Sequence, residues 1–166
     1  MRLKKIFSIA VLIVTNLFTQ GQFTSNKSTT TSKPTILFVC EHGAGRSAIA
    51  AAFFNKMAKE KKLNYQAIFR GIHPDSALGP AIQTGLMKDS VDVNGWKPVL
   101  LSTRDIQKAS RIVAMDCEIP EKDRIAKLHT QWSDIPMDQG YNDARDEIIK
   151  KLQVLILELE KQDREN

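Results

Sequence analysis

Residues 34–54 read Pro34-Thr-Ile-Leu-Phe-Val-Cys40-Glu-His-Gly-Ala-Gly-Arg46-Ser-Ala-Ile-Ala-Ala-Ala-Phe-Phe54. The run Thr35–Val39 is apolar, β-branched and aromatic, which predicts a buried strand. The alanine-rich stretch that begins at Arg46 predicts a helix to about Lys61. A cysteine therefore ends a strand, and an arginine six residues later begins a helix.

The five residues between Cys40 and Arg46 are typical of an anion-binding loop. Gly43 and Gly45 permit the positive φ angles that a tight loop requires. The loop amides and the positive N-terminal end of the helix would point at the same place, where they stabilise a thiolate and bind a tetrahedral anion beside it. Ser47 follows directly, so its hydroxyl can donate to the Cys40 thiolate. A buried structural cysteine is the less favoured interpretation.

The chain has 166 residues, enough for one domain. Residues 1–22 combine a basic start with the apolar stretch Ile6–Phe18, which is typical of a secretory signal peptide. We expect export, most simply to a periplasm, with no stable membrane association after cleavage. An uncleaved N-terminal membrane anchor is the alternative. Residues 23–33 are rich in Ser, Thr and Lys and predict a disordered linker, so the catalytic domain should occupy residues 34–166.

Charge and cysteine content exclude several classes of function. Without the three basic residues of the signal segment, the formal charge of +5 falls to +2. Because no basic stripe with interleaved aromatic residues is present, nucleic-acid binding is not expected. The two cysteines allow one disulfide at most, and neither a CxxC pair nor a cluster with zinc spacing occurs. We predict no metal site and no cofactor.

Strand and helix patterns alternate along the domain. We expect strands over 35–39, 66–70, 111–116 and 126–130, and helices over 46–61, 80–88, 102–110 and 142–161. This alternation predicts an α/β fold, a three-layer sandwich in which a four-stranded parallel sheet is flanked by helices. Ligands of such sheets bind beyond the carboxyl ends of the strands. Cys40 lies there, and the pair Asp116-Cys117 should face the same crevice.

The strand, the C-x5-R-S segment Cys40–Ser47 and the alanine-rich helix resemble the low-molecular-weight protein tyrosine phosphatases. They are also similar to the arsenate reductases that share the same fold. Arg70-Gly71 with its Pro-Asp-Ser loop, and Ile112–Asp116, match later blocks of this family in order. The chain departs from the family at Gly43, where asparagine is usual. Glycine keeps the backbone freedom of that position and loses the tether that an asparagine side chain provides.

The resemblance implies a phosphatase that acts on a phosphorylated protein or a small aryl phosphate. Cys40 would attack phosphorus, and Arg46 would bind two phosphate oxygens with its planar fork. The remaining oxygens would be bound by the loop amides of Glu41, His42, Gly43, Ala44, Gly45 and Arg46. Ser47 would stabilise the thiolate. Family enzymes protonate the leaving group with the Asp of an Asp-Pro pair, which this chain lacks. Asp134, two residues before Pro136, is the predicted acid, and Asp138 is the second candidate. The alternative is that both are solvated turn carboxylates.

Two other functions stay open at this stage. In a thiol-dependent arsenate reductase, Cys117 would be the second thiol, and an external thiol would restore both cysteines. In an oxidising compartment, a disulfide between Cys40 and Cys117 would stop the activity or belong to a redox cycle. The missing Asp-Pro pair and the missing loop asparagine also allow a third function, an anion or phosphoprotein binder without turnover.

Overall fold

Four parallel strands form the centre of the structure, a computed structural model that describes residues 33–120 and 128–165. The strands lie in the order β2-β1-β3-β4. Their bounds are Thr35–Cys40 for β1, Gln66–Gly71 for β2, Ala109–Met115 for β3 and His129–Trp132 for β4. The predicted signal peptide and nearly all of the predicted linker lie outside the described residues.

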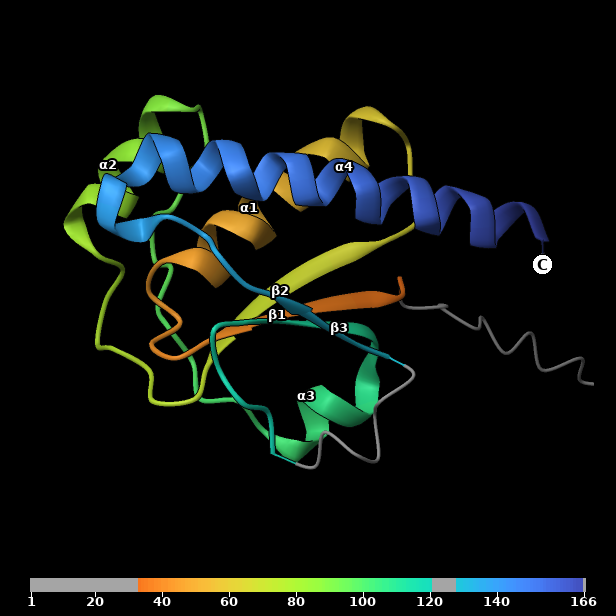
Figure 1. The fold of residues 1–166 in the computed structure, drawn as a ribbon, viewed down its shortest axis with the longest axis horizontal. Helices are drawn as coiled ribbons and strands as arrows, with labels where there is room; N and C mark the ends of the chain where they lie inside the picture. The colour runs from red at the N-terminus through yellow and green to blue at the C-terminus, as the bar shows by residue number, and fades with distance from the viewer. Residues whose placement is uncertain (1–32, 121–127, 166) are drawn as a thin grey trace, which may run out of the picture. The chain divides into compact units, whose positions relative to one another are not determined.

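The helices form a layer on each face of the sheet. They are α1 (Arg46–Glu60), α2 (Pro80–Lys88), α3 (Thr103–Lys108) and α4 (Tyr141–Glu165), with the short 3-10 turn η2 (Met137–Gln139) before α4. Figure 1 shows α1 and α4 side by side over one face, while α3 lies on the other. The predicted three-layer α/β sandwich is therefore confirmed.

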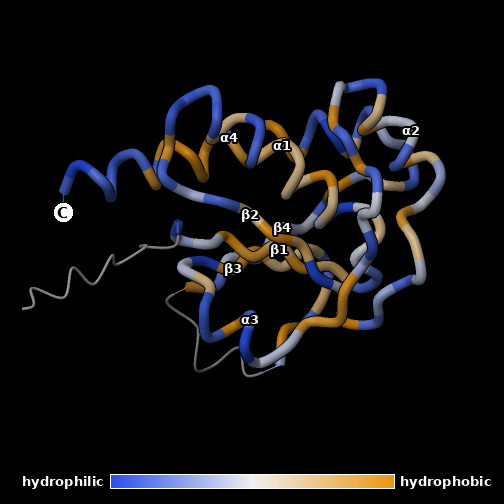
Figure 2. Tube along the Cα trace, turned by 180° about the vertical axis from the view of Figure 1, so that it is seen from behind, coloured by the Kyte–Doolittle hydropathy of each residue, from blue (hydrophilic) through white to orange (hydrophobic). Residues whose placement is uncertain are grey.

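Strand β1 is buried on both faces, as expected for the inner strand of a parallel sheet. Its side chains alternate between two clusters: Ile36 and Phe38 join the core beneath α1 and α4, whereas Leu37 and Val39 join the smaller core under α3. Figure 2 shows hydrophobic residues gathered where α1 meets the strands. Burial of each such side chain contributes about 1.5–3 kcal/mol. The end of β1 is consequently held on both sides, which fixes the position of Cys40.

The last helix follows its predicted apolar stripe and then continues beyond it. All of the stripe residues are buried. They are Ala144, Ile148, Leu152, Leu155, Ile156 and Leu159. The helix extends past the predicted end at Lys161 to Glu165, where the residues are exposed. The segment contains no Gly or Pro, and Glu, Lys, Gln and Arg are good helix formers, so the chain has no local reason to stop earlier.

The prediction of the fourth strand at residues 126–130 was wrong in its bounds. The strand spans His129–Trp132, and residues 126 and 127 lie outside the described part of the chain. His129 pairs with Ile112 and Trp132 with Met115. Trp132 is buried, and its ring centroid lies 5.8 Å from that of Phe38. Pairing with β3 and burial of this aromatic ring set the register, and neither is visible in local sequence.

Candidate active site

Cys40 is the last residue of β1, and the next helix begins six residues later. Its side chain is buried, with 4% of its surface exposed. The Sγ atom of Cys40 lies 3.1 Å from Oγ of Ser47, which is fully buried in the first turn of α1. A hydroxyl at this distance can donate to a thiolate. The N-terminal end of α1 adds a positive potential in the same place.

The carbonyl groups of the loop between β1 and α1 are bound by the segment that follows β2. Four amides of this segment donate to loop carbonyls at distances from 2.8 to 3.2 Å. The pairs are Ile72 N to Cys40 O, His73 N to Glu41 O, Asp75 N to His42 O, and Gly79 N to Ala44 O. These bonds hold the carbonyl groups of the loop against the segment after β2. The amides of the loop are therefore not used in these contacts.

The amides of this loop, in contrast to its carbonyl groups, have no backbone partner among the described residues. Across residues 33–120 and 128–165, no backbone hydrogen bond is donated by residues 41–45. Backbone N–H groups of folded proteins are nearly always paired, so a run of loop amides without a backbone acceptor fits a bound anion. Successive amides that converge in one turn form a concave site for oxyanions. The geometry fits the phosphate-binding loop expected from the sequence.

Two glycines allow the loop to approach β2 closely. Gly43 has φ of +65°, and a Cβ added there would lie 3.0 Å from the amide nitrogen of Gly71. A Cβ added to Gly71 would lie 2.8 Å from the carbonyl carbon of His42. Backbone atoms cannot move aside as a flexible side chain can, so both positions require glycine. At Gly43, steric fit explains the residue without the asparagine tether of the family.

Arg46 begins α1 and lines the same cavity as Cys40. Its Nε atom is buried and makes no hydrogen bond, although it lies 3.4 Å from Oδ2 of Asp116. Asp116 follows β3 and has φ of +48°, an unusual value for a residue other than glycine. The Asp116 carboxylate therefore restrains the guanidinium by charge, and the planar fork of Arg46 stays available for two oxygens of a tetrahedral oxyanion.

These groups surround a cavity of about 260 Å³ at the carboxyl edge of the sheet. Its lining is drawn from β1, the loop, the segment after β2, the start of α2 and the turn η2. The lining residues are Cys40, Glu41, His42, Ala44, Gly45, Arg46, Asp75, Gly79, Ile82 and Met137. A buried thiol, free amides and a guanidinium thus meet in one hollow of a size that suits a small anionic group.

The sequence over residues 35–147 matches the family described as low molecular weight phosphotyrosine protein phosphatase. The chain belongs to this family. The match includes β1, the loop, α1 and all later strands, so the cavity at Cys40 lies within the family's own segment. No curated protein matches the chain in sequence.

Solved structures of low sequence identity share the fold. YfkJ from Bacillus subtilis superposes with a TM-score of 0.71 at 20% identity, over 79% of this chain and 97% of that one. The YwlE arginine phosphatase from Geobacillus stearothermophilus gives 0.64 at 21% identity, over 80% and 97%. A thioredoxin-dependent arsenate reductase from Corynebacterium glutamicum gives 0.66 at 21% identity, over 80% and 65%. The family fold is therefore shared by phosphatases and by an arsenate reductase.

The loop after β4, where family members carry their Asp-Pro acid, sends a different side chain to the cavity. Met137 lines the hollow, and its Cε atom lies near Gly45. Asp134 is exposed, has φ of +63° and is not among the lining residues. Met137 was not predicted as a site residue, because an apolar residue in a turn gives no chemical signal. The acid role of Asp134 stays a prediction.

Cys117 lies two residues after β3, next to the end of β1. Its Sγ donates to the carbonyl of Val39 at 3.5 Å, so the thiol is held in its protonated form. Burial raises the pKa of Cys117 to about 11, and the charges of Cys40 and Glu41 act in the same direction. The two cysteines are free. Cys117 borders a separate cavity of about 570 Å³, which Glu41 and Asp116 also line.

Two histidine–carboxylate pairs include residues that line the Cys40 cavity. Nδ1 of His73 is 2.6 Å from Oε1 of Glu41, and Nδ1 of His42 is 3.5 Å from Oδ1 of Asp75. The sequence placed His42 in the loop for its amide alone and assigned no role to Asp75 or His73. The Pro-Asp-Ser turn signal could have raised attention to Asp75, but its partner lies 33 residues earlier in the chain.

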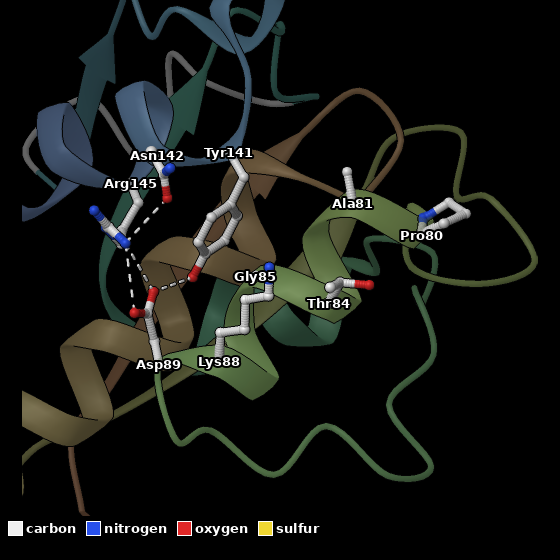
Figure 3. Close-up of a pocket in the computed structure, with 9 residues that line it drawn as sticks. All are labelled: Pro80, Ala81, Thr84, Gly85, Lys88, Asp89, Tyr141, Asn142 and Arg145. Atoms are coloured by element: carbon white, nitrogen blue, oxygen red, sulfur yellow. Dashed lines mark hydrogen bonds and ion pairs between the residues drawn. The ribbon is translucent and has the colours of Figure 1, made fainter.

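The largest described cavity, about 620 Å³, lies between α2 and α4 (Figure 3). The hydroxyl of Tyr141 donates to Asp89 at 2.6 Å, and Arg145 binds the same carboxylate. Burial disfavours the Asp89 carboxylate, but these hydrogen bonds outweigh it and lower the pKa of Asp89.

The described residues contain no group of three or more potential metal ligands. None of the described helices has the length and apolar character needed to cross a membrane.

Proposed function

We propose that this chain is a cysteine-dependent phosphatase that hydrolyses aryl or tyrosine phosphate monoesters through a phosphocysteine. The observation that carries the proposal is the position of the Cys40 thiol. It lies 3.1 Å from a buried hydroxyl, in a hollow lined by loop residues whose amides donate no backbone hydrogen bond and by Arg46. Family membership supports the same conclusion.

The reaction follows from the groups in the cavity. The Cys40 thiolate attacks phosphorus, and the bond from phosphorus to the leaving oxygen breaks as that oxygen gains a proton. Arg46 and the loop amides bind the three remaining oxygens, where negative charge is concentrated in the transition state. Water then cleaves the sulfur–phosphorus bond, and the Ser47 hydroxyl stabilises the thiolate that leaves. The sequence predicts Asp134 as the proton donor of the first step.

The direct test is hydrolysis of para-nitrophenyl phosphate by the reduced full-length chain, compared with its Cys40→Ser variant. We expect turnover by the wild type and a loss of at least about a thousandfold in the variant, because a serine hydroxyl is not ionised here. Binding of inorganic phosphate, measured by calorimetry, and an unchanged circular dichroism spectrum would show that the variant is folded. Equal turnover by both proteins would contradict the proposal, and phosphate binding without any turnover would favour a binding protein.

A second candidate function, thiol-dependent arsenate reduction, is favoured by the position of Cys117. Its Sγ contacts the residue before Cys40, and the charge of Cys40 influences it. In this reaction the Cys40 thiolate would displace a hydroxide from arsenate, which leaves as water after protonation. Cys117 would then attack the Cys40 sulfur, so that a disulfide forms and arsenite leaves with two electrons. An external dithiol would reduce the disulfide.

The two functions separate on one variant. If arsenate reduction is the function, Cys117→Ser abolishes arsenite formation in the presence of excess dithiothreitol and leaves ester hydrolysis in place. The raised pKa of Cys117 argues for slow attack by this thiol at neutral pH, which is why the phosphatase is the preferred proposal.

We also propose that the protein is exported, from the signal-like pattern of residues 1–22 alone. N-terminal sequencing of the protein from the exported fraction should give a start near Gln22. An intact Met1 in the cytosolic fraction would contradict export, and an intact Met1 in the membrane fraction would support the N-terminal anchor instead.

A further inference from the structure

We propose that His42, oriented by Asp75, is the proton donor to the leaving group in this chain. The inference rests on the proposed phosphatase function and assigns its least settled step. The loop after β4 contributes Met137 to the cavity and no carboxylate. The titratable side chains in the lining are those of Cys40, Glu41, His42, Arg46 and Asp75.

The ring of His42 has a defined orientation. Its Nδ1 atom lies 3.3 Å from the backbone carbonyl oxygen of His73 and 3.5 Å from Oδ1 of Asp75. A carbonyl oxygen can only accept, and an ionised carboxylate does the same. Nδ1 therefore carries a proton in both charge states of the ring. The proton that is exchanged must then reside on Nε2, the nitrogen that no acceptor of the protein occupies within the described residues.

The acceptor behind the ring is itself fixed. The amide of His73 donates to the carbonyl of Glu41 at 2.8 Å, and its side-chain Nδ1 lies 2.6 Å from Oε1 of the same residue. Two contacts to Glu41 thus hold His73, whose carbonyl faces His42. The His42 and Asp75 side chains are 62% and 56% exposed, so their pairing is weak in water. Hydrogen bonds of this kind are often long before substrate binds and excludes solvent.

The carboxylates of the lining suit this role less well. Oε1 of Glu41 is occupied by His73, and Oδ1 of Asp75 faces the N–H of His42. A carboxylate that accepts from a neighbour in its ionised form has no proton to give. An imidazole, in contrast, can donate a proton from one nitrogen while the other nitrogen keeps its hydrogen bond to the protein. The other charged group around the hollow is Arg46 on α1, which does not release its proton.

The protons and electron pairs of both chemical steps balance with these groups. As the Cys40 sulfur bonds to phosphorus, the leaving oxygen takes the electron pair of its broken bond and the Nε2 proton of the His42 imidazolium. The neutral imidazole then accepts a proton from the water that attacks the phosphocysteine. The sulfur leaves as a thiolate, phosphate is released, and the imidazolium is restored.

The test uses the full-length chain under reducing conditions and two esters, phenyl phosphate with a poor leaving group and dinitrophenyl phosphate with a good one. The variant is His42→Asn, because the asparagine amide can still donate to the His73 carbonyl but carries no exchangeable acid. We expect kcat/KM for phenyl phosphate to fall about a hundredfold, and kcat/KM for dinitrophenyl phosphate to fall less than about threefold. Inhibition by inorganic phosphate should not change.

Two further variants keep the test decisive. Asp75→Asn should reduce hydrolysis of phenyl phosphate by about tenfold, with the same dependence on the leaving group, because the ring is less well oriented. The assignment to His42 would be overturned if His42→Asn lost activity equally on both esters or on neither. It would also be overturned if Asp134→Asn, instead, showed a loss that depends on the leaving group. Either result would leave the phosphatase proposal intact. Absence of Cys40-dependent turnover of dinitrophenyl phosphate by the wild type would overturn both.

Discussion

The cavity at Cys40 and the cavity between α2 and α4 differ in how their polar groups are satisfied. The second is more than twice as large, about 620 Å³ against about 260 Å³. Its carboxylate, Asp89, is bound by Tyr141 and Arg145, as Figure 3 shows. In the smaller cavity, Nε of Arg46 has no hydrogen bond, and the loop amides of residues 41–45 donate none to the described backbone. Free directed donors, rather than volume, mark the site where an anion binds.

The difference also separates stability from function. The Tyr141–Asp89–Arg145 group ties α4 to the end of α2, and each satisfied hydrogen bond contributes about 0.5–1.5 kcal/mol. The amides of the loop at Cys40 have no backbone acceptor among the described residues, which leaves these donors for a ligand. Changes in the smaller cavity should therefore reduce activity, and matched changes in the larger one should reduce stability.

The largest contrast between the two cavities is expected when the arginine of each is replaced. Arg46→Lys should lower kcat for aryl phosphate hydrolysis by about a hundredfold to a thousandfold, because a point charge replaces the planar fork that binds two oxygens. Arg145→Lys is the matched control and should leave kcat within about twofold. Steady-state kinetics of both variants checks this, and similar losses in the two would remove the distinction between the cavities.

The next effect concerns one glycine from each region, Gly43 in the loop at Cys40 and Gly85 in the larger cavity. Gly43→Ala places a side chain at φ of +65°, against the backbone of Gly71. We expect a loss in kcat/KM of about tenfold to a hundredfold, because the loop amides shift. Gly85→Ala places a methyl group against the Tyr141 ring, which should reduce the free energy of unfolding by about 1–3 kcal/mol and spare activity. Urea unfolding and kinetics on both variants measure the contrast.

Tyr141→Phe should reduce the free energy of unfolding by about 1–2 kcal/mol with no change in kcat, because Asp89 loses a buried hydrogen bond. The pKa of Asp89 is lowered in the folded state, so this contribution is complete above the ordinary aspartate pKa of about 4 and is lost as the pH falls below it. Unfolding at neutral pH and at acidic pH should show the difference between variant and wild type shrinking in acid. A constant difference would exclude the linkage.

The smallest effect is expected at Cys117, which borders the separate cavity of about 570 Å³. Because its pKa is raised to about 11, about one molecule in a thousand carries the thiolate at pH 8. Cys117→Ser should therefore keep ester hydrolysis within about twofold, and serine can donate to the Val39 carbonyl as the thiol does. In the wild type, iodoacetamide should modify Cys40 well before Cys117, as peptide mapping would show. Faster modification of Cys117 would reverse the assignment of the two thiols.

Local patterns in the sequence were sufficient for β1, for α2 and for the buried stripe of α4. The helix over Pro80–Lys88 has the predicted bounds, since proline opens it and its pattern is local. The capping box of Ser102 and Asp105 is present for the same reason. The register of β4 was not predictable in this way, because it depends on pairing with β3 and on the burial of Trp132.

The candidate site also contains residues that local sequence predicts and residues that it does not. The spacing of Cys40, Arg46 and Ser47 lies within one strand–loop–helix segment, and the structure brings the three residues together. The pairing of His42 with Asp75, and the arrival of Met137 at the cavity, depend on contacts between segments far apart in the chain. A single sequence does not display such contacts, so the sequence alone points to an acid in the loop after β4.

The measurement that tests the central claim most directly is the trapping of the covalent intermediate. The reduced wild-type chain would be mixed rapidly with dinitrophenyl phosphate, quenched in denaturant, and the peptide that contains Cys40 examined by mass spectrometry. We predict a phosphoryl group on Cys40 during turnover and none on the same peptide of Cys40→Ser. Release of dinitrophenol with no phosphoryl group on Cys40, or with one on another residue, would contradict the account.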